Sequence, residues 1–203
     1  MAGVGAIVLA AGGSSRMSAG GGAPKQLLLY AGKTLLRHAV DAVLEAGCRP
    51  VVVVIGASAD RVQAELGSLP VTVAPNADWD RGIGTSIRAG VGALRALEPE
   101  IGAALIALCD QPVGLSDAVR AIVSTFRQSG ALIVASEYEG TVGPPALFRR
   151  DLFDELLHLA DAEGAKRIIQ SHRADAIAIP CPESAVDVDT PEDYRSLQSR
   201  EPY

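Results

Sequence analysis

The sequence has few cysteines, a shortage of positive charge and no long apolar run, and each of these excludes a class of protein. Its cysteines, Cys48, Cys109 and Cys181, form no CxxC pair, which argues against a disulfide framework or a zinc site and fits a reducing cytoplasm. The 18 Lys and Arg residues against 24 Asp and Glu give a net charge of −6, whereas a nonspecific nucleic-acid binder needs the opposite sign. The longest apolar stretches, such as residues 101–109, fall well short of a membrane span. We therefore expect a cytoplasmic protein that binds neither nucleic acid nor membrane.

The composition also excludes chains that do not build a core. Hydrophobic residues make up 48% of the sequence, and the 21 glycines follow no triplet rhythm, so the chain is neither disordered nor collagen-like. The 203 residues suit one domain with its own core, and we expect a single domain over residues 1–203. The apolar segment 4–11 is interpreted as a buried strand and not as a signal peptide, because a charged loop and a helix follow it.

Short apolar runs alternate with segments of helical spacing. The runs lack polar alternation, as expected of strands that are buried on both faces of a parallel sheet. They cover residues 5–9, 51–55, 71–74, 103–108, 132–136 and 176–179. The helical segments include one from Thr34 as N-cap to Gly47, one capped by Ser116 and one that begins at Pro191. This alternation predicts an α/β doubly wound sheet, whose ligands bind beyond the carboxyl ends of the strands.

The loop after the first strand is rich in small residues and carries two cations. It reads Leu9-Ala10-Ala11-Gly12-Gly13-Ser14-Ser15-Arg16-Met17, and Pro24-Lys25-Gln26 follows. Small residues let backbone amides approach anionic oxygens, and Arg16 and Lys25 can add charge at the same place. The alternative is a solvated loop with incidental cations. A Walker A loop is excluded because Leu27 stands where its first glycine is needed, and the loop also lacks the G-x-G-x-x-G fingerprint of dinucleotide binding.

These residues resemble the signature of GT-A-like nucleotidyltransferases, the group that includes the MobA-like NTP transferases. The matching elements are Leu9-Ala10-Ala11-Gly12, Ser15-Arg16-Met17 and Pro24-Lys25. Members of this group move a nucleoside monophosphate from an NTP to a phosphorylated acceptor. The resemblance runs in order from Ile7 to Tyr194 and implies a single-domain, three-layer α/β/α fold with a mostly parallel, Rossmann-like sheet.

The resemblance assigns roles to the first loop and to the loop after residues 71–74. It implies that Arg16 and Lys25 bind the phosphates and offset the charge that develops at the α-phosphorus, which makes them catalytic candidates together with Asp110. An Asn-x-x-Trp-x-x-Gly segment followed by a serine resembles the base-recognition segment of the family. From spacing alone, this segment is equally a polar loop that ends in a helix cap. The expected nucleotide-binding residues are Ala10, Ala11, Gly12, Gly13, Ser15, Arg16, Lys25, Asn76, Gly82 and Ser86.

Two acidic segments are candidates for binding Mg²⁺. Asp110 stands at the tip of a buried strand, where a carboxylate needs a cation or hydrogen bonds to compensate its charge. A turn-forming aspartate before Pro112 is the alternative, and the Asp-x-Pro turn of the family favours the metal. Asp187 and Asp189 alternate with valines, so both can point one way from a strand. The resemblance places a metal or nucleotide ligand there, with Asp187 preferred over Asp189.

The acceptor side is expected around Gln111, Gly143 and Pro145. Residues 143–148 predict a rigid turn between a strand and a helix, and they resemble a Gly-x-Pro-x-Leu-Phe element that lines the pterin side in molybdenum cofactor cytidylyltransferases. Pro144 stands where members often carry histidine. The segment 161–166 resembles the Gly-Asp-x-Gly-Ala-Arg turn of that family imperfectly, since Ala162 replaces its aspartate and Lys166 its arginine.

The leading expectation is therefore transfer of CMP from CTP to molybdopterin with Mg²⁺ and release of pyrophosphate. The resemblance also implies a transient contact with a molybdenum hydroxylase or its chaperone. Three alternatives stay open: a methylerythritol-phosphate cytidylyltransferase, a molybdenum cofactor guanylyltransferase, and a catalytically silent nucleotide-binding chaperone. The first of these usually carries a His-Asp-x-x-Arg-Pro element where this chain has residues 108–112.

Overall fold

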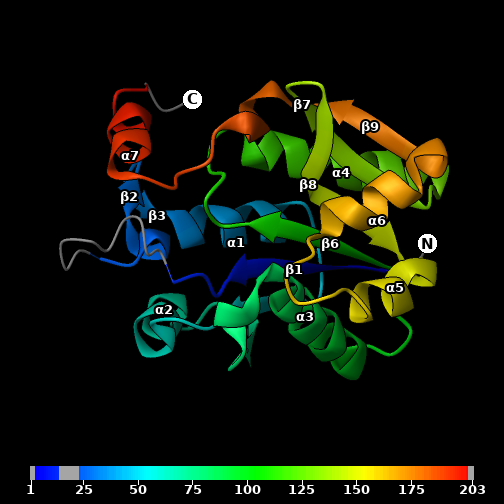
Figure 1. Ribbon diagram of the computed structural model, residues 1–203, viewed down its shortest axis with the longest axis horizontal. Helices are drawn as coiled ribbons and strands as arrows, with labels where there is room; N and C mark the ends of the chain where they lie inside the picture. The colour runs from blue at the N-terminus through cyan, green and yellow to red at the C-terminus, as the bar shows by residue number, and fades with distance from the viewer. Residues whose placement is uncertain (1–2, 14–22, 201–203) are drawn as a thin grey trace.

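The computed structural model describes residues 3–13 and 23–200, and its central feature is a seven-stranded sheet (Figure 1). The strand order is β5-β4-β1-β6-β8-β7-β9, and every neighbouring pair is parallel except the two that involve β8. The strands are β1 (Val4–Ala10), β4 (Val51–Ile55), β5 (Thr72–Pro75), β6 (Ala103–Leu108), β7 (Ile133–Tyr138), β8 (Thr141–Arg149) and β9 (Ala176–Pro180). The predicted mostly parallel α/β fold is confirmed.

Helices cover both faces of this sheet, which gives the predicted three layers. One face packs against α1 (Leu35–Glu45), α2 (Ala59–Leu66) and α4 (Leu115–Ser129), and the other against α3 (Ile83–Leu97), α5 (Phe153–Leu157) and α6 (Ala165–Ser171). Alternate residues of β1 divide between the two cores: Val8 joins the first and Ile7 the second. All seven residues of β1 are buried, which explains why the strand lacks polar alternation.

The predicted turn at residues 143–148 is wrong, because these residues lie inside β8. This strand runs antiparallel between β6 and β7. Its pairing with β7 shifts at one point: Ala135 pairs with Ala146, and the next residue of β7 pairs with Gly143. Pro144 and Pro145 fall within this irregularity, where a residue without an N–H does not interrupt the ladder. A pair of prolines therefore marks a bulge here and not a connection.

The predicted helix starts are confirmed at Thr34 and Pro191 but not at Ser116. The Thr34 hydroxyl accepts a hydrogen bond from the Arg37 amide, and α7 (Pro191–Gln198) begins with a capping box at Thr190. Helix α4 begins one residue before Ser116, after a glycine in the left-handed conformation. Helix α2 has no counterpart among the predicted elements, since only Val62 and Leu66 of its eight residues are buried. Two apolar residues are too few to produce a helical pattern.

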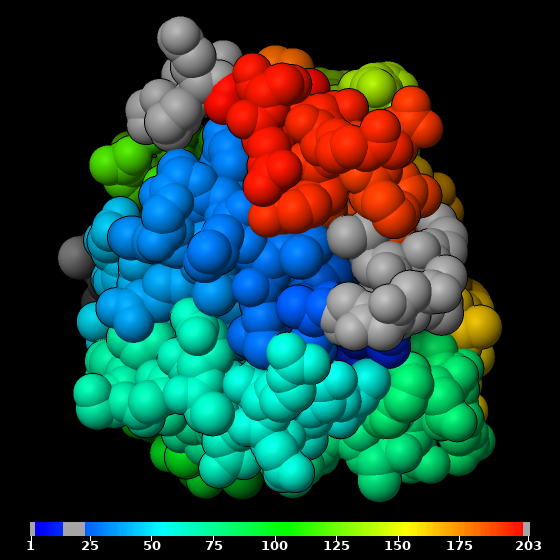
Figure 2. Space-filling model, turned by 90° about the vertical axis from the view of Figure 1, so that its left-hand side faces the viewer, coloured from blue at the N-terminus to red at the C-terminus, as the bar shows by residue number. Residues whose placement is uncertain are grey.

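The C-terminal helix brings distant parts of the sequence together. Helix α7 packs on the hairpin of β2 (Leu29–Tyr30) and β3 (Lys33–Thr34), and the Tyr194 hydroxyl donates a hydrogen bond of 2.9 Å to the Leu29 carbonyl. Figures 1 and 2 show these red and blue segments side by side. The chain that leads into α7 therefore lies beside the chain that follows β1. Within the described ranges, no helix is long and apolar enough to cross a bilayer, and the three cysteines are buried and unpaired.

Candidate active site at the carboxyl edge of the sheet

A cavity of about 200 Å³ lies where β1 and β6 end. Its lining comes from the end of β1, from the short 3-10 helix Lys25–Leu27, from the first turn of α3 and from the tip of β6. Of the predicted site residues, it includes Ala10, Ala11, Gly12, Lys25, Ser86 and Asp110. Gly13, Asn76 and Gly82 are not part of this lining, and Ser15 and Arg16 lie outside the described residues. The topology therefore brings together residues that are up to 100 positions apart in the sequence.

Gln26 holds the first loop in place. Its side chain is only 1% exposed, and its Nε2 donates hydrogen bonds to the carbonyls of Ala10 at 3.1 Å and Gly12 at 2.7 Å. A third loop carbonyl, that of Ala11, accepts from the Ala57 amide. Because the carbonyls of Ala10, Ala11 and Gly12 are all hydrogen-bonded, the loop backbone has a fixed orientation at the cavity. Gln26 was not among the predicted site residues. In the sequence it is marked only by its place directly after Lys25.

Lys25 joins two acidic segments. Its Nζ lies 2.5 Å from Asp110 Oδ2 and 2.8 Å from Asp189 Oδ1, and its side chain is 13% exposed. Burial alone lowers the pKa of a lysine, but the charge and hydrogen bond of Asp110 and the hydrogen bond of Asp189 outweigh it and raise the pKa of Lys25. Lys25 is therefore a fixed positive charge at neutral pH.

Asp110 presents one further oxygen at the tip of β6. Its Oδ1 is buried and has no hydrogen-bond partner among the described residues. A buried carboxylate oxygen without a partner is costly, and a cation is the group that compensates it best. Burial raises the pKa of the neighbouring Cys109 thiol, so Cys109 is an inert, small packing residue.

Asp187 and Asp189 lie on an irregular segment and not on the predicted strand. The segment is anchored by Val188, which is fully buried and donates its amide to the Asp110 carbonyl at 3.0 Å. Partial burial raises the pKa of the Asp187 carboxyl; the Gln111 amide lowers it, while the charges of Asp110 and Asp189 raise it further. Asp189 forms an ion pair with Lys25, whereas no ion pair of Asp187 is found among the described residues. The order of preference given to Asp187 over Asp189 finds no support in these contacts.

The acidic residues fit one divalent cation without forming a closed cage. In residues 3–13 and 23–200, no group of three or more His, Cys, Asp and Glu side chains is arranged to hold a metal ion. Mg²⁺ does not need such a cage, because it keeps several waters and takes one or two carboxylates together with phosphate oxygens. The unpartnered Oδ1 of Asp110 and the nearby Asp189 match that requirement.

The opposite end of the cavity is built from neutral hydrogen bonds. Asn76 is 8% exposed, and its Nδ2 donates to Thr85 Oγ1 at 2.8 Å and to Ser86 Oγ at 3.0 Å. Its Oδ1 accepts from the Asp78 amide at 3.0 Å. Because the Ser86 oxygen accepts from Asn76, the hydroxyl hydrogen of Ser86 points elsewhere, and no group among the described residues accepts it. Ser86 is therefore a hydrogen-bond donor at the cavity wall, and Asn76 orients it from behind.

Trp79 and Ile83 add apolar surface to this end. Both line the cavity, and Ile83 is 41% exposed. A Cβ at Gly13 would lie 2.5 Å from the Trp79 ring, so the first loop and the tryptophan fit closely only because that residue is glycine. The sequence placed the tryptophan in the Asn-x-x-Trp segment and gave no indication of Ile83, which looks like any apolar residue at a helix start.

The predicted acceptor-side residues are placed inside the sheet and beside it. Gly143 and Pro145 are buried in β8, and a Cβ at Gly143 would lie 2.5 Å from the Tyr138 hydroxyl. Gln111 is 3% exposed; its Nε2 donates to the Ser184 carbonyl at 3.1 Å, while its Oε1 has no partner among the described residues. Gln111, which directly follows Asp110 in the sequence, lies outside the lining of the cavity, as do Gly143 and Pro145.

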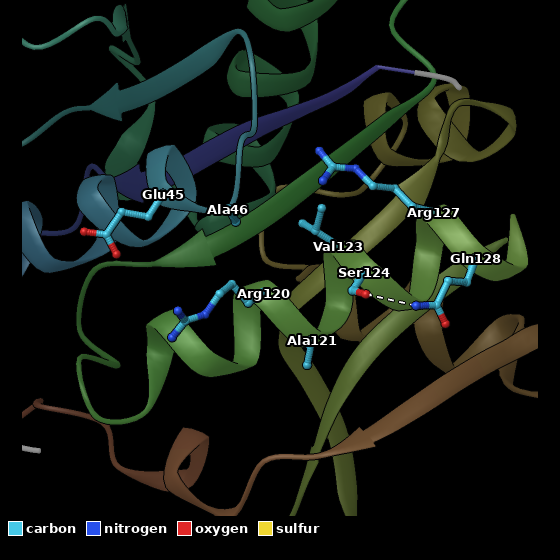
Figure 3. Close-up of a pocket in the computed structure, with 8 residues that line it drawn as sticks. All are labelled: Glu45, Ala46, Arg120, Ala121, Val123, Ser124, Arg127 and Gln128. Atoms are coloured by element: carbon cyan, nitrogen blue, oxygen red, sulfur yellow. Dashed lines mark hydrogen bonds between the residues drawn. The ribbon is translucent and has the colours of Figure 1, made fainter.

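A second hollow, of about 660 Å³, lies between α1 and α4, toward the amino ends of the strands (Figure 3). Its walls are the end of α1, around Glu45, and the α4 residues between Arg120 and Gln128. The Arg49 amide donates to the Val4 carbonyl at the start of β1, so this end of α1 lies at the amino edge of the strands. In α/β folds, ligands bind beyond the carboxyl ends of the strands, and we therefore place the site at the smaller cavity.

Comparison with known proteins identifies the family. The family model described as "MobA-like NTP transferase domain" matches residues 6–176. The crystal structure of Rv0371c from Mycobacterium tuberculosis H37Rv superposes with a TM-score of 0.83 at 30% identity, and covers 98% of both chains. A complex of Rv0371c with manganese is also known. A nucleotidyl transferase from Methanothermobacter gives a TM-score of 0.78 at 26% identity, and covers 96% of this chain and 95% of that one.

The curated relatives carry different names, among them nicotine blue oxidoreductase and, at 37% identity over 129 residues, bifunctional protein GlmU from Anaeromyxobacter sp. (strain K). Nicotine blue oxidoreductase from Paenarthrobacter nicotinovorans is 41% identical over 110 residues, which are 54% of this chain and 50% of that protein. The chain spans half or less of the length of the curated relatives it matches. These names do not agree on one reaction. The family itself is shown by the extent of the matching model, and the chain belongs to the MobA-like NTP transferase family.

Proposed function

We propose that this chain is a Mg²⁺-dependent nucleotidyltransferase that transfers CMP from CTP to molybdopterin and releases pyrophosphate. The observation that carries the proposal is the position of Lys25, whose ammonium group lies between Asp110 and Asp189 beside the glycine-containing loop. A fixed cation, backbone amides of small residues and carboxylates that suit Mg²⁺ are the groups that a triphosphate requires.

The phosphate end of the nucleotide would lie along Ala10, Ala11 and Gly12. Gln26 fixes the carbonyls of this segment, which leaves small residues at the cavity where backbone can approach phosphate oxygens. Lys25 supplies a positive charge at the same place. Arg16, which lies outside the described residues, is proposed as the second cation of this end.

The base would lie against Ser86, Ile83 and Trp79. This end of the cavity offers a base one hydroxyl and apolar surface. Ser86 is held as a donor by Asn76, and cytosine N3 accepts a hydrogen bond, whereas uracil N3 carries a hydrogen. The proposal of CTP as substrate follows from this donor, together with the resemblance of the Asn-x-x-Trp segment.

Asp110 and Asp189 are the residues that would hold Mg²⁺. Rv0371c has been crystallised with manganese, an ion with similar oxygen ligands. When bound, the ion neutralises charge on the triphosphate and on the departing pyrophosphate. Asp110 offers the unpartnered Oδ1, and Asp189 is held close by its ion pair with Lys25.

The transfer needs no protein nucleophile. A phosphate oxygen of the acceptor forms a bond to the α-phosphorus, the bond from that phosphorus to the bridging oxygen breaks, and the electron pair leaves with pyrophosphate. Lys25 stabilises the charge that develops on the phosphate oxygens, and the fixed loop keeps the nucleotide in line with the attacking oxygen. The chain therefore contributes positioning and charge neutralisation.

The acceptor would approach from the side of Gln111 and Asp187. The buried Oε1 of Gln111 lacks a partner among the described residues, and the carboxylate of Asp187 belongs to the segment that follows Ser184, whose carbonyl accepts a hydrogen bond from Gln111. Both groups accept hydrogen bonds, which suits the N–H groups of a pterin. Molybdopterin as acceptor, and delivery of the product to a molybdenum hydroxylase or its chaperone, are the parts of the proposal that rest on the resemblance of residues 143–148.

The proposal is tested by measuring pyrophosphate release from each of the four NTPs with Mg²⁺ and either molybdopterin or methylerythritol phosphate. We expect turnover with CTP that depends on molybdopterin, and none for an Asp110→Asn variant prepared in parallel. Turnover with methylerythritol phosphate, or with GTP and molybdopterin, would assign one of the other transferase activities. Binding of CTP without a product from any acceptor would contradict catalysis and indicate a chaperone.

A further inference from the structure

The turn between α5 and α6 packs on the first turn of α3. In Figure 1 this yellow segment passes beside the start of α3. The Gly84 amide donates a hydrogen bond of 2.8 Å to the Asp161 carbonyl. The contact joins residues that are 77 positions apart, and it meets α3 immediately beside Ile83 and Ser86, which line the cavity.

Two glycines at the start of α3, the N-cap Gly82 and Gly84, are required by this contact. A Cβ at Gly82 would lie 2.3 Å from the Asp161 carbonyl oxygen, and a Cβ at Gly84 would lie 2.1 Å from the Ala160 oxygen. Gly82 also has a φ of 135°, which side chains rarely adopt. Gly82, predicted to contact the base, is therefore explained by the close approach of the turn to the backbone.

Arg88 and Asp161 fix the turn with side chains. One guanidinium nitrogen of Arg88 donates to the Leu159 carbonyl at 2.5 Å, and the other donates to Asp161 Oδ1 at 2.6 Å. Asp161 Oδ2 lies 2.6 Å from a guanidinium nitrogen of Arg81. The hydrogen bond from Arg88 lowers the pKa of Asp161; burial opposes this, and the charges of both arginines lower the pKa further. The carboxylate is therefore ionised at neutral pH. It joins Arg81, which precedes α3, to Arg88 on α3.

We infer that Arg88 and Asp161, together called the α3 latch, are positioning residues that hold Ile83 and Ser86 in place for the nucleoside end of the substrate. This inference rests on the proposed function. It gives the turn at residues 159–164 a role in supporting the nucleotide-binding residues, although the sequence of this turn resembles one on the acceptor side of the family. Among residues 3–13 and 23–200, the contacts of the latch go to Arg81 and to the turn and do not include Lys25 or residues 9–13, so we expect it to act on base binding and not on the phosphates.

The test compares CTP with inorganic tripolyphosphate, which has the phosphates but no base. Trp79 is the single tryptophan and lines the cavity, so its fluorescence follows both titrations in the presence of Mg²⁺. For Asp161→Ala and Arg88→Lys we expect the Kd of CTP to rise roughly tenfold, while the Kd of tripolyphosphate stays within about twofold. Asp161→Asn keeps an acceptor for Arg88 and should show a smaller rise.

A matched control is available on the same helix. Arg95 forms an ion pair of 2.9 Å with Asp154 of α5, so Arg95→Ala also removes a link from α3 but far from the cavity; it should change neither affinity. Equal weakening of CTP and tripolyphosphate, or unchanged CTP binding in all latch variants, would overturn the inference alone. Failure of the wild-type chain to bind any NTP would instead overturn the proposed function, and the inference with it.

Discussion

The two ends of the cavity are built by different physical means. At the phosphate end, Lys25, Asp110 and Asp189 come from three separate segments and are held together by charge at 2.5 and 2.8 Å. At the base end, Asn76, Thr85 and Ser86 form a neutral network of hydrogen bonds. Charge is strong but not selective among nucleotides, because all of them carry the same phosphates. Neutral donors and acceptors with fixed directions distinguish one base from another.

This comparison predicts that variants at the phosphate end reduce turnover for every nucleotide, whereas variants at the base end change the choice of nucleotide. The largest effect is expected for Asp110→Asn, which keeps the shape of the side chain. It removes a carboxylate from both Lys25 and the proposed metal. We expect kcat/KM to fall by roughly a hundredfold or more, with an unchanged circular dichroism spectrum.

Asp117→Asn is the control for that variant. Asp117 is an exposed aspartate on α4 that pairs with Arg120, and its loss should leave turnover within about twofold, as surface ion pairs contribute little. Retained activity in Asp110→Asn would remove Asp110 from the reaction.

Lys25→Met should have the second largest effect. The change leaves Asp110 and Asp189 close together without their shared cation, so both the triphosphate affinity and the folded state lose stabilisation. We expect the Kd of tripolyphosphate to rise roughly tenfold or more and the thermal midpoint to fall by several degrees. Lys25→Arg keeps the charge and should recover part of both. Equal tripolyphosphate affinity in Lys25→Met and the wild type would contradict the role of Lys25.

Asn76→Ala should change selectivity more than rate. Without Asn76 the Ser86 hydroxyl is no longer held as a donor, so the preference for CTP over UTP should shrink roughly fivefold to tenfold. Competition between the two nucleotides measures this ratio. Ser86→Ala should cause the same loss, and the double variant should add little because both changes remove one interaction. Additive losses would show that Asn76 does not act through Ser86.

The smallest effect concerns the pH dependence of stability at Asp187. Burial and the charges of Asp110 and Asp189 raise the pKa of this carboxyl above its ordinary value of 3.8, so the folded chain binds the proton more tightly than the unfolded chain. Stability is therefore lost as pH rises from the ordinary value through the raised one. Asp187→Asn should be more stable than the wild type above this window and equal to it below, as measured by urea denaturation at several pH values.

Asp41 is a control whose pKa is shifted in the opposite direction. Burial raises its pKa, but the hydrogen bonds and charges of Lys33 and Arg37 outweigh this and lower it. Its contribution is present above the ordinary carboxyl pKa and is lost as pH falls through the lowered value. Asp41→Asn should therefore be less stable than the wild type near neutral pH. The same sign for both variants would contradict the electrostatic account of Asp187.

The parts of the site that could be predicted from sequence are those fixed by topology. Apolar runs located the strands, and residues at strand tips must gather at one edge of a parallel sheet, so Lys25, Asp110 and the loop at Ala10 were expected to meet. Asp189 was expected there only through the family resemblance. The layered fold followed from the alternation of strands and helices, which needs no knowledge of side-chain contacts.

The parts that escaped prediction depend on contacts between segments that sequence patterns do not connect. Gln26 and Arg88 act on backbone carbonyls, and any chain offers such carbonyls at every residue. The two prolines of β8 indicated a turn because the bulge that accommodates them exists only once β7 is paired. Asn76 was expected as a base contact, and no sequence pattern indicated that its Nδ2 donates hydrogen bonds to Thr85 and Ser86.

The most direct test of the account is a crystal structure with Mn²⁺ and a non-hydrolysable CTP analogue. The account predicts an anomalous peak for the metal beside Asp110, the triphosphate along Ala10 to Gly12 with Lys25 in contact, and the base against Ser86. A nucleotide bound in the hollow at the amino edge of the sheet, or a metal far from Asp110, would contradict it.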